Sequence, residues 1–188
     1  MASLGHIAIG LAAGRLCWST LAPRPSLPAA MLALSALSLL PDADVIAFKL
    51  RIPYAAPFGH RGASHSLAAA LACGLLCTGL YWLWSRGRGL RALYNGLFAT
   101  AVVASHGLLD AMTDGGLGVA LLWPLSNHRY FAPWRPIPVA PIGARMLSGR
   151  GLEVVTTELL YFLPLLIYAL WPRRRTEAAE AVSPESNL

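Results

Sequence analysis

The sequence predicts an all-α, polytopic membrane protein with about five transmembrane helices and a metal site at one end of them. Of the 188 residues, 56% are hydrophobic and only 13% are charged, and the mean hydropathy is +0.53. Soluble globular proteins carry about 25% charged residues. The apolar residues also form long runs of the length that crosses a bilayer as a helix. These observations favour a single integral membrane domain over a soluble one.

The first two apolar runs cover residues 4–21 and the stretch that begins near Leu27. The first lacks a basic start and a small-residue cleavage site, so we expect a retained span rather than a signal peptide. The second reaches Leu40, where Pro41-Asp42-Ala43-Asp44 interrupts it after a length of about 21 Å, short of the roughly 30 Å of hydrocarbon. Either residues 45–50 complete the crossing, or the two aspartates lie in a recess below the membrane surface. We favour the recess.

Three further spans are expected after residue 62. Ser64 is a suitable N-cap for the third, which runs to about Trp84, and the fourth covers roughly residues 90–110. Residues 111–152 contain too much Pro and Gly for a span, so we expect an interfacial loop or short helix with its tryptophans at headgroup depth. The last span runs from about Glu153 to Trp171. Residues 1–172 therefore form one helical transmembrane domain, and residues 173–188 a disordered polar tail.

The stretch around His106 and Asp110 carries the most specific chemistry. Four residues separate the two, so on a helix both side chains project from one face. An imidazole beside a carboxylate suits an ion of the zinc type. An unpaired carboxylate near lipid is costly, which calls for such a partner. The alternative is a neutral hydrogen bond between helices.

Threading five spans through a membrane brings every aspartate and every histidine to one side. The N-terminus, residues 41–65 and residues 111–152 share that side, whichever way the whole topology is oriented. Random placement would scatter these groups over both faces. The set on this side consists of His6, Asp42, Asp44, His60, His65, His106, Asp110, Asp114, His128 and Glu153.

A family resemblance rests on motifs that occur in a fixed order along the chain. They are Leu40-Pro41-Asp42-Ala43-Asp44, Gly59-His60-Arg61-Gly62-Ala63-Ser64-His65-Ser66, Ser105-His106 through Asp110 and Thr113, and Leu122-Trp123-Pro124. Over roughly residues 5–160 the chain resembles the YdjM family of bacterial inner-membrane metal-dependent hydrolases, with Gly5-His6 and Glu153 also at family positions.

The resemblance implies an all-helical fold around a metal cluster, because that family is grouped with the zinc-dependent phospholipase C and single-strand nuclease superfamily. The superfamily's His-x-x-x-Asp element matches His106 and Asp110. Its His-x-x-x-Glu element has no counterpart, since no histidine precedes Glu153 at that spacing, and this leaves the number of metal ions open.

The candidate ligands offer nitrogen and oxygen donors and no sulfur. Such a set suits Zn²⁺, with Mn²⁺ or Ni²⁺ as alternatives. The three cysteines lie in apolar runs and are assigned no chemistry. The metal ligands are to be drawn from His6, Asp42, His60, His65, His106 and Asp110.

The other polar residues on this side receive supporting roles. Asp44, Asp114 or Glu153 is expected to act as general base or as hydrogen-bond partner of a ligand histidine. Arg61, Arg129 and Arg135 are candidates for holding a substrate phosphate, with Arg135 also suited to a loop at headgroup level.

We therefore expect a membrane-bound metal-dependent hydrolase that cleaves a phosphoester in a phospholipid or lipid-linked phosphate with a metal-activated water. One alternative is an ester or amide hydrolase with the same metal site. Another is a non-enzymatic metal-binding or transport protein. The arginines are scattered through apolar sequence, which disfavours nucleic-acid binding.

The expected location is the bacterial inner membrane, with lipid as environment and substrate. A basic turn at residues 86–91 and Arg173-Arg174-Arg175 favour a cytoplasmic position for their side, so the site is expected to face outward to the periplasm. The opposite loops carry about as many basic residues, and the oligomeric state stays open.

Overall fold

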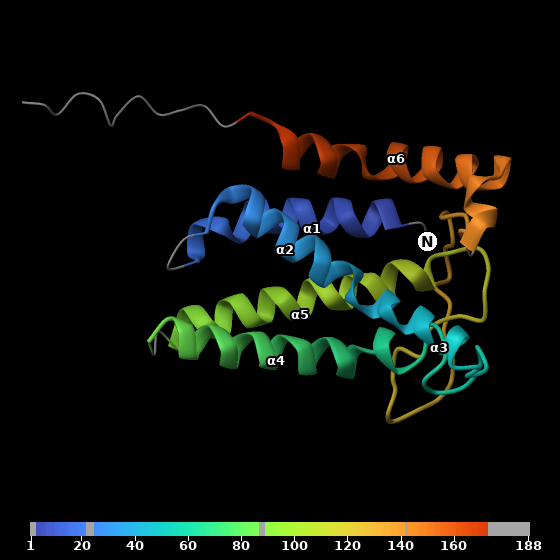
Figure 1. Ribbon diagram of the computed structural model, residues 1–188, viewed down its shortest axis with the longest axis horizontal. Coiled ribbons are helices and arrows are strands. Elements are labelled where there is room, and N and C mark those ends of the chain that lie inside the picture. The colour runs from blue at the N-terminus through green and yellow to red at the C-terminus, as the bar shows by residue number, and fades with distance from the viewer. Residues whose placement is uncertain (1–2, 22–24, 87–88, 142, 173–188) are drawn as a thin grey trace, which may run out of the picture.

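The computed structural model describes residues 3–21, 25–86, 89–141 and 143–172, which form a bundle of helices (Figure 1). The α-helices are α1 (Ser3–Cys17), α2 (Leu27–Leu39), α3 (Ile46–Lys49), α4 (Leu67–Trp84), α5 (Gly89–Ala111) and α6 (Gly149–Leu170). Short 3-10 helices are η1 (Trp18–Thr20), η2 (Leu40–Val45), η3 (Ala63–His65) and η4 (Gly143–Leu147). Within the described ranges there are only isolated β-bridges and no strand, so the all-α prediction is confirmed.

The two ends of the bundle differ. At the loop end, on the right in Figure 1, α1 and α6 begin, α5 ends, and η2, η3 and residues 112–141 and 143–148 come together. At the turn end, on the left, α1 and α6 end, α2 begins, and α4 is joined to α5.

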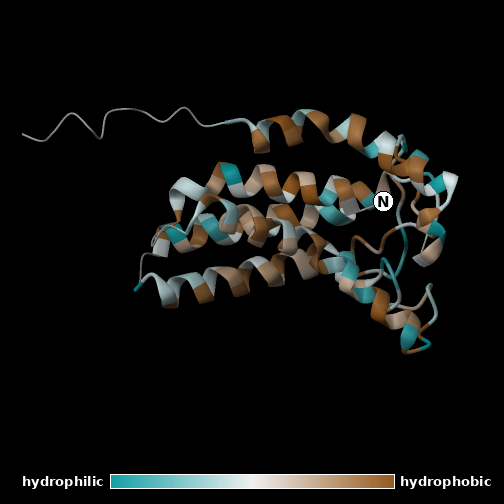
Figure 2. Cartoon of the chain, turned by 45° about the horizontal axis from the view of Figure 1, so that its top comes forward, coloured by the Kyte–Doolittle hydropathy of each residue, from teal (hydrophilic) through white to brown (hydrophobic). Residues whose placement is uncertain are grey.

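In the part of the chain that the structure describes, four helical stretches are long and apolar enough to cross a membrane: Leu27–Lys49, Leu67–Trp84, Gly89–Ala111 and Gly149–Leu170. Figure 2 shows hydrophobic residues dominating the long helices, with hydrophilic residues more frequent in the loops. Many leucines on the outer faces of these helices are exposed, as expected for contact with lipid.

The first expected span, residues 4–21, is shorter than the sequence suggested. The α-helical part of α1 has 15 residues, about 22 Å, and gives way to η1 at Trp18 instead of continuing to residue 21. The prediction of about five helices in a multi-pass arrangement holds, with α1 as the short member.

The second span continues past the aspartates. Pro41 has no N–H to donate to the preceding turn, and the chain tightens into η2 before α3 resumes the α-helix. Residues 45–49 thus extend the helical stretch to Lys49, which is the first of the two alternatives and not the recess that we favoured. The side chains of Asp42 and Asp44 are nevertheless only 28% and 9% exposed.

Close packing of α1 on α2 positions the first histidine. A Cβ on Gly10 would lie 2.3 Å from the Cα of Ser35, and one on Gly14 would lie 2.4 Å from the Cα of Met31. Only glycine lets the two backbones approach this closely, as in other small-residue interfaces between membrane helices. His6 lies one turn before Gly10 on the same stripe of α1, so this packing carries it to the bundle interior.

The start of the third span needs a correction. The N-cap of α4 is Ser66, whose Oγ accepts a hydrogen bond from the backbone N–H of Ala69 at 3.0 Å. Ser64 was expected there, but its hydroxyl donates to the carboxylate of Asp44 at 2.6 Å. Two serines two residues apart both satisfy a capping pattern, and the 3-10 turn of η3 decides between them.

The long connection between α5 and α6 folds over the loop end. Bridges between Thr113 and Ile137 and between Val119 and Tyr130 hold it there. It contains the expected short helix, η4, and the last span begins earlier than expected, at Gly149. The α6 helix packs against α1. The expected polar tail, residues 173–188, lies outside the described residues.

Candidate metal centre

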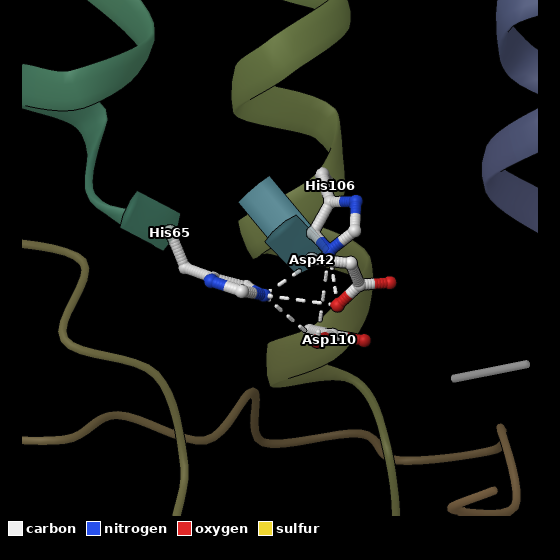
Figure 3. Close-up of side chains that lie close together, drawn as sticks. All are labelled: Asp42, His65, His106 and Asp110. Atoms are coloured by element: carbon white, nitrogen blue, oxygen red, sulfur yellow. Dashed lines mark hydrogen bonds and ion pairs between the residues drawn. The ribbon is translucent and has the colours of Figure 1, made fainter. Parts of the chain in front are cut away.

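Four side chains from three separate elements converge at the loop end. Asp42 comes from η2, His65 from η3, and His106 and Asp110 from the last turns of α5 (Figure 3). Each offers one ligand atom, two nitrogens and two oxygens in all, and these atoms lie within 4.8 Å of one another. The spacing of His106 and Asp110 on α5 thus places both on one face, as the sequence predicted.

The distances between these atoms are close to those between the ligands of a tetrahedral ion. The two Nε2 atoms of His65 and His106 are 3.1 Å apart, and they lie 3.6 and 3.3 Å from Oδ1 of Asp42. Oδ2 of Asp110 is 3.5 Å from Nε2 of His65 and 3.9 Å from Nε2 of His106. Ligands about 2.0–2.2 Å from a tetrahedral zinc ion stand roughly 3.3–3.6 Å apart.

Both histidines are held so that Nε2 faces the cluster. Nδ1 of His106 lies 2.7 Å from the carbonyl oxygen of Ser38, and a carbonyl only accepts, so Nδ1 carries the proton. Nδ1 of His65 lies 3.0 Å from Oδ2 of Asp44. Such bonds fix the tautomer of metal-binding histidines and leave the other nitrogen for the ion.

Asp44 is the centre of a hydrogen-bond network behind His65. Its carboxylate accepts from the backbone N–H of Arg61 at 3.1 Å and from the hydroxyl of Ser64 at 2.6 Å, and it contacts Nδ1 of His60 at 2.6 Å. Asp44, His60 and His65 form a second group with metal-ligand atoms. Nδ1 of His60 and Oδ1 of Asp44 are 2.6 Å apart, which is a hydrogen-bond distance. Two ligand atoms of one zinc ion stand clearly farther apart. We interpret this group as a support for His65.

Three carboxylates control the protonation of His65. Burial alone lowers the pKa of its imidazole, but the bonds to Asp110, Asp42 and Asp44 outweigh burial and raise the pKa to about 10. In the metal-free protein at neutral pH His65 therefore carries a proton that a metal ion would have to displace.

His6 is fully buried beside the cluster. Its ring stacks on that of His106, with centroids 3.7 Å apart, and its Nε2 lies 3.7 Å from Oδ1 of Asp110. Among the described residues neither ring nitrogen of His6 has a hydrogen-bond partner. The ring thus packs against His106 at the edge of the cluster and faces the carboxylate of Asp110 just beyond hydrogen-bond distance.

Arg61 lies inside the cluster rather than at its entrance. It is 3% exposed, its Nε lies 3.0 Å from Oδ2 of Asp110, and its Nη1 donates to Oγ1 of Thr113 at 2.9 Å. Its backbone has a φ of 61°, in the left-handed region. Arg61 thus orients Asp110 and supplies the positive charge that a buried carboxylate needs.

The other two arginines expected to bind phosphate contact protein groups. The guanidinium of Arg129 donates to five backbone carbonyls, those of Tyr54, Ala56, His60, Arg61 and Gly118. The guanidinium of Arg135 lies over the ring of Phe131, 4.9 Å from its centroid.

Asp114 and Glu153, two of the expected catalytic residues, contact Arg150. Both lie on the surface, 48% and 59% exposed. Nη1 of Arg150 is 3.0 Å from the carboxylate of Glu153, and Nη2 is 3.4 Å from that of Asp114. These contacts join the start of α6 to the long loop, whereas the third expected catalytic residue, Asp44, lies beside the cluster.

Glu158 is a site residue that the sequence reasoning missed. It is fully buried in α6, and its Oε2 accepts from the backbone N–H of Gly5 at 3.1 Å, near the start of α1. A carboxylate there stabilises the positive end of the α1 dipole and holds the turn that carries His6. A lone acidic residue in the middle of an apolar span was the signal that could have found it.

Comparison with known proteins agrees with the membrane fold. The sequence is 42% identical over 174 residues to "Inner membrane protein YbcI" of Escherichia coli (strain K12), an alignment that covers 90% of this chain and 96% of that protein. No solved structure matches the chain. The profile of the family described as YdjM inner membrane protein matches residues 1–179. The chain therefore belongs to the YdjM inner membrane protein family.

Proposed function

We propose that this protein is a metal-dependent hydrolase whose divalent ion, preferentially Zn²⁺, is held by Asp42, His65, His106 and Asp110. The observation that carries the proposal is the spacing of their four ligand atoms, all within 4.8 Å, together with the two histidines whose Nδ1 atoms are held by other groups. Donor chemistry of nitrogen and oxygen without sulfur also allows Mn²⁺ or Ni²⁺.

The chain's own groups divide the remaining work. When bound, the ion would supply a Lewis acid that lowers the pKa of water and polarises a substrate oxygen. Asp44 accepts four contacts and acts as a positioning residue for His65. We assign the proton-acceptor role to Asp42, the one partly exposed residue of the cluster. Its Oδ1 faces the other three residues, and its Oδ2 is directed away from them (Figure 3).

The proposed substrate is a phosphoester in a phospholipid or lipid-linked phosphate. Its support is the position of the cluster at one end of membrane-spanning helices, with the cation of Arg61 beside it. An ester or amide substrate is a second candidate, because Arg61, Arg129 and Arg135 already contact protein groups and an uncharged substrate needs no free arginine.

We also propose that the loop end faces the periplasm. Arg86 and Arg91 lie at the turn end, in keeping with a cytoplasmic position. At the loop end Arg61, Arg129 and Arg150 are held by internal partners. Green fluorescent protein fused after residue 188 should fluoresce, and alkaline phosphatase fused at the same place should be inactive, because both fusions would lie in the cytoplasm. The reverse pattern would overturn this orientation.

The activity is tested on total lipid extract in mixed micelles, with products identified by mass spectrometry. We expect the Zn²⁺-loaded protein to release phosphorylated headgroups and Asp42→Asn to lose at least about 100-fold of the rate. His128→Ala, an exposed loop histidine, is the matched control and should keep full activity. Cleavage of ester or amide substrates alone would favour the second candidate. Metal-loaded protein that cleaves none of these would leave a non-enzymatic metal-binding protein.

A further inference from the structure

An apolar groove of about 310 Å³ lies between α1, α5 and α6, and it runs from Val102, one turn before His106, toward Leu16 near the turn end. Its size falls at the lower end of ligand pockets, about 300–1,000 Å³. The small side chains of Ala12 and Ala13 on α1 and Ala101 on α5 leave the space, and Leu165 and Tyr168 of α6 form the opposite wall. The lining is apolar along its length, so a hydrocarbon chain fits it and a polar ligand does not.

The groove ends beside a positive charge. Leu16 and Tyr168 line it near the ends of their helices. Next to Leu16, Nη1 of Arg15 donates to the carbonyl oxygen of Ala169 at 3.0 Å, and the guanidinium carbon lies 5.5 Å from the centroid of the Tyr168 ring. These contacts hold the Arg15 charge at the turn end of the groove.

The charged residues at the turn end of the bundle are basic in the part of the chain that the structure describes. Arg15, Arg86 and Arg91 belong to the turn end. The acidic residues in the described ranges all belong to the loop end; they are Asp42, Asp44, Asp110, Asp114, Glu153 and Glu158. A headgroup phosphate near Arg15 thus meets a field that attracts it, and a guanidinium bonds phosphate with two parallel hydrogen bonds.

We propose that this groove binds one anionic phospholipid, with its phosphate on Arg15 and one acyl chain between α1, α5 and α6. This lipid would fill the space beside α6, which packs against α1. The phosphate on Arg15 would lie at the turn end, and the lipid is a bound component rather than a substrate, so the proposal stands whether or not the protein is a hydrolase.

The test is native mass spectrometry of the delipidated full-length protein titrated with dioleoylphosphatidylglycerol or dioleoylphosphatidylcholine, which share acyl chains and differ in headgroup charge. The wild type should bind the anionic lipid about tenfold more tightly. Arg15→Gln should bring the two affinities together. Ala101→Leu, which fills the groove, should weaken binding of both lipids by about tenfold. Ala72→Leu on the exposed face of α4 is the matched control and should change neither.

Three results would overturn the proposal. The first is equal affinity of the wild type for the two lipids, and the second is unchanged binding in Ala101→Leu. The third is a protein dimer that Ala101→Leu abolishes, since the groove would then be an interface between two copies. Leu165→Trp fills the groove from α6 and replaces Ala101→Leu if circular dichroism shows that variant to be unfolded.

Discussion

Nδ1 of His106 donates a hydrogen bond to the backbone carbonyl of Ser38, 2.7 Å away and 68 residues earlier in the chain. This bond links α5 to the end of α2 and turns Nε2 of His106 toward Asp42, 3.3 Å away. A backbone acceptor cannot be removed by side-chain substitution, so the orientation of His106 is built into the packing of the two helices.

The corresponding bond of His65 can be removed. Asp44→Asn keeps the shape of the side chain but loses the negative charge that holds Nδ1 of His65. We expect metal affinity to fall about 10–100-fold while the helical content is unchanged. Competition with a chelating dye measures the affinity, and Asp114→Asn on the surface serves as control. Equal affinities of the two variants would show that Asp44 does not support the site.

Arg61 and the metal ion supply positive charge to the same carboxylate. Arg61→Met leaves Asp110 buried without its cation. In the metal-free protein we expect the free energy of unfolding to fall by about 3–5 kcal/mol, and the thermal midpoint to fall with it. Added Zn²⁺ should raise the thermal midpoint of this variant more than that of the wild type, because the guanidinium of Arg61 no longer repels the ion. Differential scanning fluorimetry in detergent measures both shifts, and a smaller shift in Arg61→Met would contradict this role.

Arg129 is expected to hold the loop that carries His60 and His65. Arg129→Lys keeps the charge, but a lysine cannot donate to all five carbonyls. We therefore expect the free energy of unfolding to fall by about 2–3 kcal/mol, and backbone amides in residues 54–61 to exchange faster. Arg135→Lys, over the ring of Phe131, is the matched control and should leave that exchange unchanged. Exchange at the wild-type rate in Arg129→Lys would favour a substrate role instead.

Metal binding should depend on pH in one direction. The pKa of His65 is raised to about 10 in the metal-free protein, so below that pH a proton occupies the imidazole and competes with the ion. Raising the pH removes this competition, and the apparent affinity should increase about tenfold per unit between about pH 6.5 and 8.5. Calorimetry in buffers of different ionisation enthalpy should detect about one proton released per ion. An affinity independent of pH would mean that His65 is neutral before the metal binds.

Much of the arrangement at the loop end could be predicted from the sequence. Span lengths and the order of loops require the segments that carry His6, Asp42, His65 and His106 to share one side of a membrane, and the structure places them at one end. A helical spacing of four residues likewise puts His106 and Asp110 on one face. These predictions depend only on helix geometry and chain connectivity.

The partners of the arginines could not be predicted in the same way. Sequence gives the charge of Arg129, but its five acceptors are carbonyls whose directions depend on the turns of residues 54–61 and 118. Glu158 meets Gly5 only because α6 packs against α1, a contact between segments 153 residues apart. The 3-10 turn of η3 directs Ser64 to Asp44 and leaves Ser66 to cap α4, and the sequence pattern alone does not distinguish the two serines.

The central claim is that Asp42, His65, His106 and Asp110 hold one divalent ion together. Elemental analysis of the purified wild type, His106→Ala and Asp110→Ala, with His128→Ala as control, tests it most directly. We predict about one ion per chain in the wild type and the control, and less than about a tenth of that in both cluster variants. Equal metal content in all four proteins would contradict the account.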